Sequence, residues 1–184
     1  MSLRITAGVF KGRILKAPAG MRTRPTHARL RQAIFNQLQG RTDGARVLDV
    51  FAGSGAIGFE ALSRGAEQTV FVEVDRAVVR LIEENAKTLD CEEQITIVSG
   101  AFEKLCDRIA SLGPFDLVFA DPPYEKGWEK KLLEAFDWTV LVKSDGRVYL
   151  ESSSRTEIEL NVAGLRLLEK RLYGDSALHI YERN

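Results

Sequence analysis

The tetrapeptide Asp121-Pro122-Pro123-Tyr124 combines residue types that could hold a planar amine for reaction. It follows the apolar run 115–120, and two consecutive prolines cannot continue a helix or a central strand. The Asp121 carboxylate and the rigidly aimed Pro122 carbonyl could accept hydrogen bonds from the two N–H groups of an exocyclic amine. The Tyr124 ring could stack on a nucleobase, which contributes about 1–3 kcal/mol. Because a free Asp has a pKa of about 3.9, the motif predicts positioning of the amine rather than strong-base chemistry.

A glycine-rich turn, Gly53-Ser54-Gly55-Ala56-Ile57-Gly58, follows a second apolar strand and opens a helix. Such glycines let the backbone approach a ligand, and the N–H groups of the helix start can face its anionic part. The pattern fits a nicotinamide or flavin dinucleotide, and it also fits S-adenosylmethionine. Glu73, 20 residues after Gly53, could accept hydrogen bonds from a ribose diol. Both kinds of cofactor carry that diol, so Glu73 does not discriminate between them.

Asp49 favours one of these cofactors. It lies inside the strand that precedes the turn, in Leu48-Asp49-Val50-Phe51-Ala52-Gly53. A carboxylate there would repel a pyrophosphate and would attract the ammonium and sulfonium groups of S-adenosylmethionine. A carboxylate that only accepts hydrogen bonds from turn amides is the alternative.

Charge is segregated along the chain although the net charge is zero. Residues 1–46 hold ten Lys and Arg and one acid, a net charge of +9, and the remaining residues hold 16 bases and 25 acids, a net charge of −9. This asymmetry favours a polyanionic partner for the N-terminal part, with an ordinary solvated basic face as the alternative.

The rest of the chain must position these groups, and its pattern predicts alternating strands and helices. Residues 3–17 predict two short strands, and Thr26 is a candidate N-cap of a helix that runs to about Gln39. Predicted strands follow at 47–51, 69–73, 95–98, 115–120 and 147–151, and predicted helices at 56–64, 77–89, 102–110 and 128–136. A hairpin is predicted from 165–173 and 177–181.

This is the pattern of a doubly wound, Rossmann-like α/β fold whose mostly parallel sheet ends in an antiparallel hairpin. The strands before Gly53 and Asp121 should be neighbours, so that the two motifs face each other.

Other features of the sequence limit the class of protein to which the chain can belong. No apolar stretch approaches the roughly 20 residues that span a bilayer, and no signal peptide is visible, which predicts a cytoplasmic protein without a membrane partner. Cys91 and Cys106 form no metal-ligand pattern, so no metal site is predicted and free thiols are expected. No long apolar stripe is left over, which favours a monomer.

Residues 47–55 and 121–124 resemble the cofactor and amino-methyltransferase motifs of class I S-adenosylmethionine-dependent enzymes. More narrowly, the chain resembles the RsmD family, the bacterial enzymes that methylate guanine N2 in small-subunit ribosomal RNA. Four further stretches carry this resemblance: Arg4-Ile5-Thr6-Ala7-Gly8 with Lys11-Gly12-Arg13; Thr23-Arg24-Pro25-Thr26 with Arg29, Arg31, Phe35 and Asn36; Phe59-Glu60-Ala61-Leu62-Ser63-Arg64-Gly65-Ala66; and Tyr173-Gly174-Asp175. The N-terminal stretches are the discriminating ones, since the Asp-Pro-Pro-Tyr motif also occurs in DNA adenine methyltransferases.

The resemblance implies a role for each candidate residue. Cofactor binding is assigned to Asp49, Phe51, Ala52, Gly53, Gly55, Glu73, Ala101 and Phe102. The guanine amine is assigned to Asp121, Pro122, Pro123 and Tyr124. RNA binding is assigned to Arg22, Arg24, Thr26 and Arg29, with a place near the cofactor as the alternative for Arg24 and Thr26. In one departure from the family, Ser99-Gly100-Ala101-Phe102 replaces an Asn-Asp-Ala-like motif, so adenine contacts are expected from the Ala101 backbone and the Phe102 ring.

These observations predict one methyltransferase domain over residues 1–184, with a basic RNA-binding extension at 1–42 and a catalytic core at 43–184 that binds S-adenosylmethionine. The expected partner is 16S ribosomal RNA, in the small subunit or in its assembly intermediate. A DNA adenine-N6 methyltransferase is the alternative, although no segment is left over to read duplex DNA. A second alternative, a dinucleotide-dependent oxidoreductase, is supported by the glycine turn and Glu73 alone. A third alternative, a non-catalytic RNA-binding protein, is supported by Gly100 alone.

Overall fold

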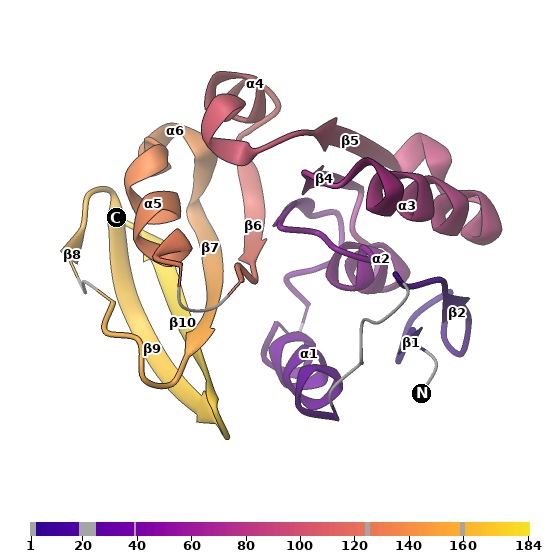
Figure 1. The fold of residues 1–184 in the computed structure, drawn as a ribbon, viewed down its shortest axis with the longest axis horizontal. Coiled ribbons are helices and arrows are strands. Elements are labelled where there is room, and N and C mark those ends of the chain that lie inside the picture. Colours follow the sequence, from indigo (N-terminus) through magenta and orange to yellow (C-terminus); the bar gives the residue numbers. More distant parts are fainter. Residues whose placement is uncertain (1–2, 19–24, 39, 124–125, 159–160) are drawn as a thin grey trace.

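A twisted eight-stranded sheet organises the described part of the chain (Figure 1). The computed structural model describes residues 3–18, 25–38, 40–123, 126–158 and 161–184, and for residues 25–29 and 161 it describes the backbone alone. The strand order is β5-β4-β3-β6-β7-β10-β9-β8. Neighbours from β5 to β7 are parallel, and the pairs β7–β10, β10–β9 and β9–β8 are antiparallel. The predicted α/β sheet with an antiparallel C-terminal hairpin is confirmed.

The sheet strands are β3 (Arg46–Val50), β4 (Gln68–Glu73), β5 (Ile95–Ser99), β6 (Phe115–Ala120), β7 (Val142–Ser153), β8 (Asn161–Val162), β9 (Leu165–Tyr173) and β10 (Ser176–Arg183). A separate antiparallel pair is formed by β1 (Leu3–Arg4) and β2 (Ile14–Leu15). The helices are α1 (Pro25–Gln37), α2 (Ala56–Ser63), α3 (Arg76–Leu89), α4 (Cys106–Ser111), α5 (Trp128–Ala135) and α6 (Trp138–Leu141), with short 3₁₀ turns η1 (Glu92–Gln94) and η2 (Phe102–Lys104). Among the described helices, none is both long enough and apolar enough to cross a membrane.

Four local predictions need correction. Thr26 is not an N-cap, because α1 begins one residue earlier, at Pro25, whose fixed φ suits the first helical position. The strand predicted at 47–51 ends at Val50, since Phe51 has φ of 65°. The helix predicted at 102–110 is divided into η2 and α4. The strand predicted at 147–151 is the last part of the longer β7, and α6 and β8 were not anticipated.

Two hydrophobic clusters cover the two faces of the sheet, as its alternating side chains require. One cluster joins Val47, Phe71 and Phe119 to helices α1, α2 and α3. The other joins Leu48, Val70 and Val118 to the segment that contains α4, α5 and α6, among other residues. Consecutive residues of one strand therefore face different helical layers. Asp49, two residues after Val47, points toward the layer that contains α1 and α2.

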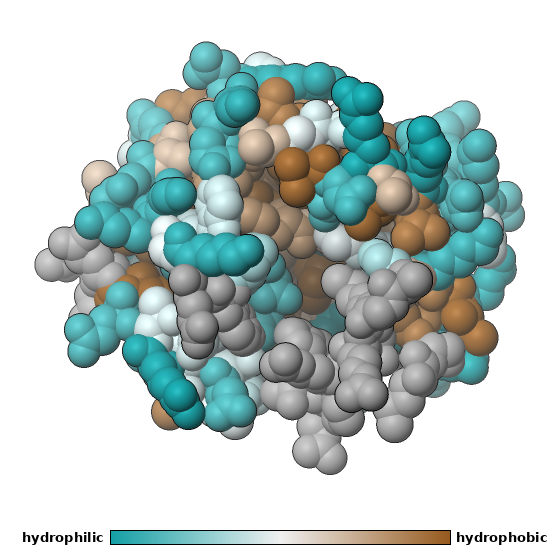
Figure 2. All heavy atoms as spheres, in the orientation of Figure 1, coloured by the Kyte–Doolittle hydropathy of each residue, from teal (hydrophilic) through white to brown (hydrophobic). Residues whose placement is uncertain are grey.

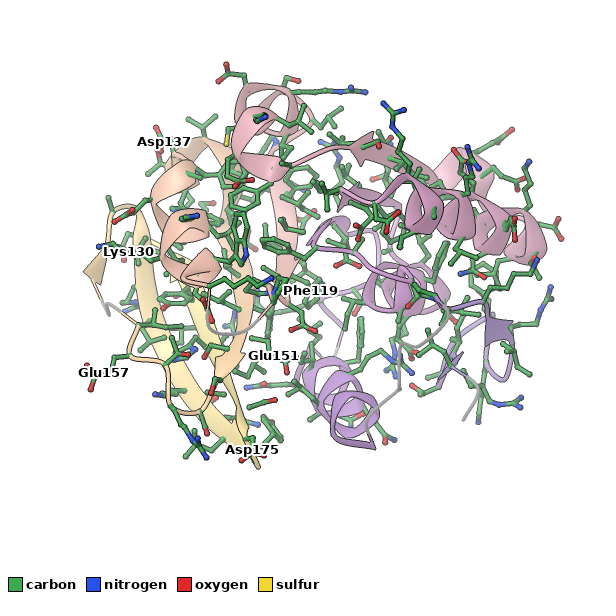
Figure 3. All side chains as sticks on the ribbon, in the orientation of Figure 1. Phe119, Lys130, Asp137, Glu151, Glu157 and Asp175 are labelled. Carbon is green, nitrogen blue, oxygen red and sulfur yellow. The ribbon has the colours of Figure 1, made fainter. Side chains whose placement is uncertain are left out.

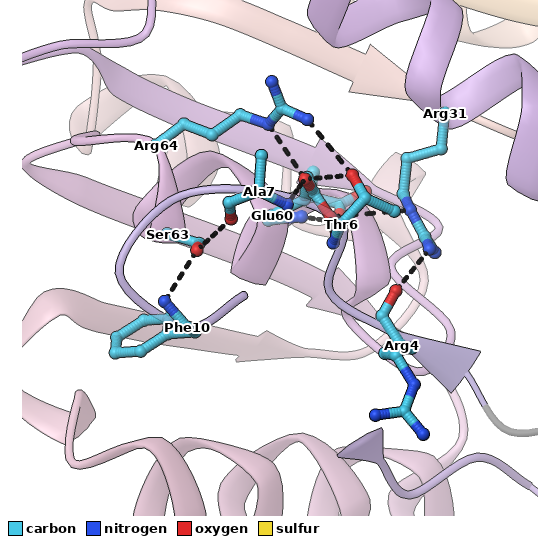
Figure 4. Close-up of polar contacts among 10 residues, drawn as sticks. Arg4, Thr6, Ala7, Phe10, Arg31, Glu60, Ser63 and Arg64 are labelled. Atoms are coloured by element: carbon cyan, nitrogen blue, oxygen red, sulfur yellow. Dashed lines mark hydrogen bonds and ion pairs between the residues drawn. The ribbon is translucent and has the colours of Figure 1, made fainter. Parts of the chain in front are cut away.

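Glu60 of α2 holds the N-terminal segment against this first layer (Figure 4). Its fully buried carboxylate accepts hydrogen bonds from Thr6 N at 2.9 Å, Thr6 Oγ1 at 2.6 Å and Ala7 N at 3.1 Å. It also accepts a hydrogen bond from Arg64 Nε at 2.8 Å and lies 3.8 Å from Arg31 Nε. Arg31 in turn donates a hydrogen bond to the Arg4 carbonyl at 2.8 Å. One buried acid therefore ties β1, α1 and α2 together.

Replacing this acid should destabilise the fold strongly. Glu60→Ala leaves two arginines and two backbone N–H groups without their shared acceptor, which should lower the free energy of unfolding by about 3–5 kcal/mol. Equilibrium unfolding in urea measures this change. The control is Glu134→Ala, which breaks the exposed Lys130–Glu134 pair and should stay within about 0.5 kcal/mol of wild type. Equal losses for the two variants would contradict a clamping role for Glu60.

Candidate active site

A pocket of about 220 Å³ opens at the carboxyl ends of the central parallel strands. Its floor is formed by Phe119 and Tyr149 of the sheet together with Leu178 of β10, and one wall is formed by Leu30 and Ile34 of α1, among other residues. In Figure 2 the central part of this face is hollowed, with hydrophobic surface inside. This is the edge at which open α/β sheets bind their ligands.

Three carboxylates reach this pocket from three neighbouring strands. In the parallel register Asp49 of β3 lies beside Phe119 of β6, which lies beside Tyr149 of β7. Side chains two residues apart share a face, so Asp121 follows Phe119 and Glu151 follows Tyr149 on the same side of the sheet. Asp49, Asp121 and Glu151 all line the pocket. Its described cationic residue is Arg31, whose side chain is 7% exposed.

The glycine turn is shaped by the carboxylates of the strands around it. Gly53 N donates a hydrogen bond to Glu73 Oε2 at 2.8 Å, and Gly58 N donates one to Asp49 Oδ2 at 3.1 Å. Phe51 has φ of 65°, which is an uncommon conformation for a residue with a side chain. Gly55 has φ of 75°, and a Cβ there would lie 2.7 Å from the Phe59 ring. The turn is therefore held in one conformation by carboxylates of the two strands beside it, β3 and β4.

Electrostatics at this pocket favour a cationic or hydrogen-donating ligand. Burial, opposed by the Gly58 hydrogen bond and reinforced by the charges of Asp121 and Glu73, raises the pKa of Asp49 well above its ordinary value. The pKa of Asp121 is also raised, first by the protein that surrounds its carboxyl and then by the charge of Glu151. Asp121 nevertheless keeps surface that is accessible from the pocket. A ligand that brings positive charge or N–H donors would offset the burial and the neighbouring negative charge, and would stabilise the ionised forms of Asp49 and Asp121.

The structure brings together many of the predicted site residues. Asp49, Phe51, Ala52, Gly53 and Asp121 line the pocket. Glu73 borders it through its bond to Gly53, and Gly55 lies in the same turn, where its N–H bonds the Ala52 carbonyl.

Other predicted residues lie apart from the pocket lining or outside the described part. Phe102 is 3% exposed, with its ring against Phe51 at 5.2 Å and Trp128 at 5.9 Å, so its ring face is covered by protein in this structure. Pro122 is buried, Pro123 is exposed, and Ala101 is half-buried at the start of η2. Tyr124, Arg22 and Arg24 lie outside the described residues, and Thr26 and Arg29 are placed in α1 by their backbone alone.

Gly100 has a conformational reason to replace an acid. Its φ is +142°, and a Cβ at this position would lie 2.9 Å from Leu105 Cδ1. Its N–H donates a hydrogen bond to the Glu73 carbonyl at 2.8 Å. A residue with a side chain would be strained in this conformation, which favours glycine at this position.

Sequence reasoning missed Glu151 as a pocket residue. It lies two residues before the end of β7, while Asp121 directly follows β6 and Glu73 ends β4. An acid at the carboxyl end of each of three parallel strands was the signal that could have identified it. The pocket position of Arg31 was also not predicted, although its sequence context matched the family.

Fold and site together define a protein of the class I methyltransferase type, with acidic strand ends around a glycine turn and an Asp-Pro-Pro corner beside it. The chain belongs to the family described as conserved hypothetical protein 95, whose family model matches residues 3–182. This membership confirms the resemblance to the RsmD family.

Individual relatives agree over nearly the whole chain. YlbH of Bacillus subtilis is 36% identical over 98% of this chain and 99% of its own. The ribosomal RNA small subunit methyltransferase D of Escherichia coli K12 is 32% identical over 98% of this chain and 90% of its own. The solved structure of the Escherichia coli protein yhhF superposes with a TM-score of 0.85 at 32% identity, covering 98% of this chain and 97% of that one.

The raised pKa of Asp49 predicts a pH-dependent effect of Asp49→Asn on stability. Asn keeps an oxygen that can accept from Gly58 N–H, but it does not titrate. The folded protein holds the Asp49 proton to higher pH than the unfolded chain, so wild type loses stability as pH rises above about 4 toward the folded pKa. The variant should therefore gain stability relative to wild type between pH 4.5 and 7.5, as measured by urea unfolding.

Asp137→Asn is the matched control, because Asp137 is an exposed N-cap whose pKa is lowered by its hydrogen bonds to Thr139. The stability that ionised Asp137 contributes is complete above about pH 4 and is lost only on further acidification. Its variant should show no gain between pH 4.5 and 7.5. A constant difference between Asp49→Asn and wild type across this range would contradict the raised pKa.

Proposed function

We propose that this protein transfers a methyl group from S-adenosylmethionine to the exocyclic N2 amine of a guanine in 16S ribosomal RNA. The observation that carries the proposal is the row of carboxylates from β3, β6 and β7 beside the glycine turn. The name of the Escherichia coli relative, ribosomal RNA small subunit methyltransferase D, supports the substrate class.

The residues of the pocket fit this cofactor. Asp49 offers negative charge to an ammonium or a sulfonium, and Glu73 lies at the end of β4, where it could accept from a ribose diol. The cofactor would supply the electrophilic methyl group. Phe51, Ala52, Gly53 and Gly55 would hold its methionine part, and Ala101 with Phe102 its adenine. For Phe102 this role requires its ring to leave the contacts described above.

Asp121 and the proline corner would orient the acceptor. The guanine amine is a weak nucleophile because its lone pair is delocalised into the ring. The Asp121 carboxylate and the Pro122 carbonyl would accept its two N–H groups, Pro123 would keep the corner rigid, and Tyr124 would stack on the base. The base must be flipped out or already unpaired to reach this pocket. Positioning, rather than strong-base catalysis, would supply most of the rate.

The basic N-terminal part would bind the RNA. We assign residues 1–42 to an RNA-binding extension and residues 43–184 to the catalytic core of one domain, acting as a cytoplasmic monomer. In Figure 1, α1 lies between the β9–β10 hairpin and the β1–β2 pair, and Gln37 donates a hydrogen bond to Glu169 of β9 at 3.0 Å. Arg31 of this extension lines the pocket, so the extension would bring positive charge to it. The assembled small subunit or its assembly intermediate is the proposed form of the substrate.

Methyl transfer from radiolabelled S-adenosylmethionine tests the function directly. The acceptors are small ribosomal subunits without N2-methylguanine, the matching naked ribosomal RNA, and unmethylated duplex DNA. We expect label recovered as N2-methylguanosine from RNA. Label recovered only from DNA adenine would contradict the proposal and favour the DNA methyltransferase alternative.

Asp121→Ala should lower turnover by at least about 100-fold, because the amine loses its oriented carboxylate acceptor. Calorimetric binding of S-adenosylhomocysteine should stay within a few-fold of wild type, which separates loss of the acceptor site from loss of the fold. Turnover that remains within a few-fold of wild type would refute the positioning role of Asp121.

Replacing Arg22, Arg24 and Arg29 together by Gln should flatten the salt dependence of RNA binding. Each lost phosphate contact should reduce the slope of log affinity against log salt by about 0.7–0.9. The control triple is Lys104→Gln, Arg108→Gln and Lys130→Gln, exposed cations on the segment of η2, α4 and α5 that covers the other face of the sheet. An equal change of slope for both triples would show that the basic extension is not the RNA-binding surface.

A further inference from the structure

Glu151 is a buried acid inside the pocket, and nothing above gives it a role in the reaction. Its side chain is 6% exposed, and it lines the pocket together with Asp121 and Asp49. Figure 3 shows Glu151 near the end of β7, below Phe119 and toward α1. Its backbone pairs with Leu178 of β10, whose side chain belongs to the pocket floor. Glu151 therefore lies at the same edge as the proposed acceptor site.

Glu151 is also the neighbour of Asp121 along the row of carboxylates. Ala120 of β6 pairs with Leu150 of β7, so the next residues of these parallel strands are Asp121 and Glu151. Adjacent strands lie about 4.8 Å apart, and both side chains belong to the face that carries the pocket. Burial first, and then the charge of Glu151, raises the pKa of Asp121, as expected for two neighbouring carboxyl groups.

Two neighbouring acceptors match the edge of guanine and mismatch the edge of adenine. Guanine presents N–H donors at N1 and at N2 side by side. Adenine presents a lone pair at N1, and 2-aminopurine combines an N2 amine with a lone pair at N1. A carboxylate that faces N1 would accept from guanine and would repel the lone pair of either other base.

We propose that Glu151 is a specificity-determining residue that accepts the N1–H of the target guanine while Asp121 holds its N2 amine. This inference rests on the proposed guanine-N2 activity. A site built to hydrogen-bond a substrate N–H rejects an analogue that lacks it, because the buried acceptor is then left facing a lone pair. Glu151 thereby distinguishes guanine from other bases that could offer an exocyclic amine at Asp121.

The test uses a substrate base that lacks O6 and therefore the N1–H, together with a protein variant that replaces one carboxylate oxygen of Glu151 by an amide nitrogen. Wild-type enzyme first identifies the methylated guanine, and ligated RNA is then prepared with either guanine or 2-aminopurine at that position. The measured quantity is the ratio of kcat/KM for guanine to kcat/KM for 2-aminopurine. Wild type should prefer guanine by at least about 100-fold. In Glu151→Gln the amide N–H₂ can donate to N1 of 2-aminopurine, so the ratio should fall by at least 10-fold.

Two further variants separate specificity from structure. Glu151→Ala should lose activity on guanine without gaining activity on 2-aminopurine, because it has neither the acceptor nor the donor. Glu129→Gln alters another buried glutamate, 2% exposed, that does not line this pocket, and it should leave the ratio unchanged. A purely structural role for Glu151 would lower both rates together and would not change their ratio.

Failure of this inference is distinguishable from failure of the proposed function. Wild type that methylates guanine but accepts 2-aminopurine within about 10-fold overturns the role of Glu151, and this result needs no variant. An unchanged ratio in a Glu151→Gln protein that still binds S-adenosylhomocysteine overturns it as well. Wild type without activity on any guanine overturns the proposed function, and the role of Glu151 with it.

Discussion

The parallel register of β3, β6 and β7 is the constraint on which the site depends. Asp49, Phe119 and Tyr149 lie side by side in that register, and alternation along each strand puts the next acids on the same face. A shift of one residue in any strand would turn its acid toward the opposite layer of helices. The hydrophobic residues of these strands are buried on both faces of the sheet and hold the register. They therefore determine where the acidic side chains lie.

One wall of the acidic pocket is formed by the basic N-terminal segment, and a buried acid holds that segment in place. Glu60 joins Thr6, Ala7, Arg31 and Arg64, so β1 and α1 are attached to α2, the helix that opens at the glycine turn. Arg31 connects the two regions, because it lies near Glu60 and also lines the pocket. The segment proposed to bind RNA and the segment proposed to bind the cofactor thus share one support.

Much of the site could be predicted because its signals are local. The turn at Gly53, the acid at Asp49 and the corner at Asp121 are each readable from neighbouring residues, and a parallel α/β pattern places them at one edge. The boundaries of α1 and of the helix after Gly100 were less predictable, since backbone conformation there depends on contacts with distant parts of the chain. The covered ring of Phe102 is such a case, because Phe51 and Trp128 come from two other segments.

The sequence by itself determined the fold class, the candidate acids Asp49, Glu73 and Asp121, and the charge difference between the N-terminal part and the rest. These follow from periodicity and composition, which act over a few residues at a time. Only the tertiary structure decided that Glu151 joins Asp121 in one pocket, that Arg31 reaches the same pocket, and that Glu60 is a clamp. Each of these depends on strand order, register and packing between segments that are distant in the sequence, such as Thr6 and Glu60, 54 residues apart, and local periodicity alone does not specify such contacts.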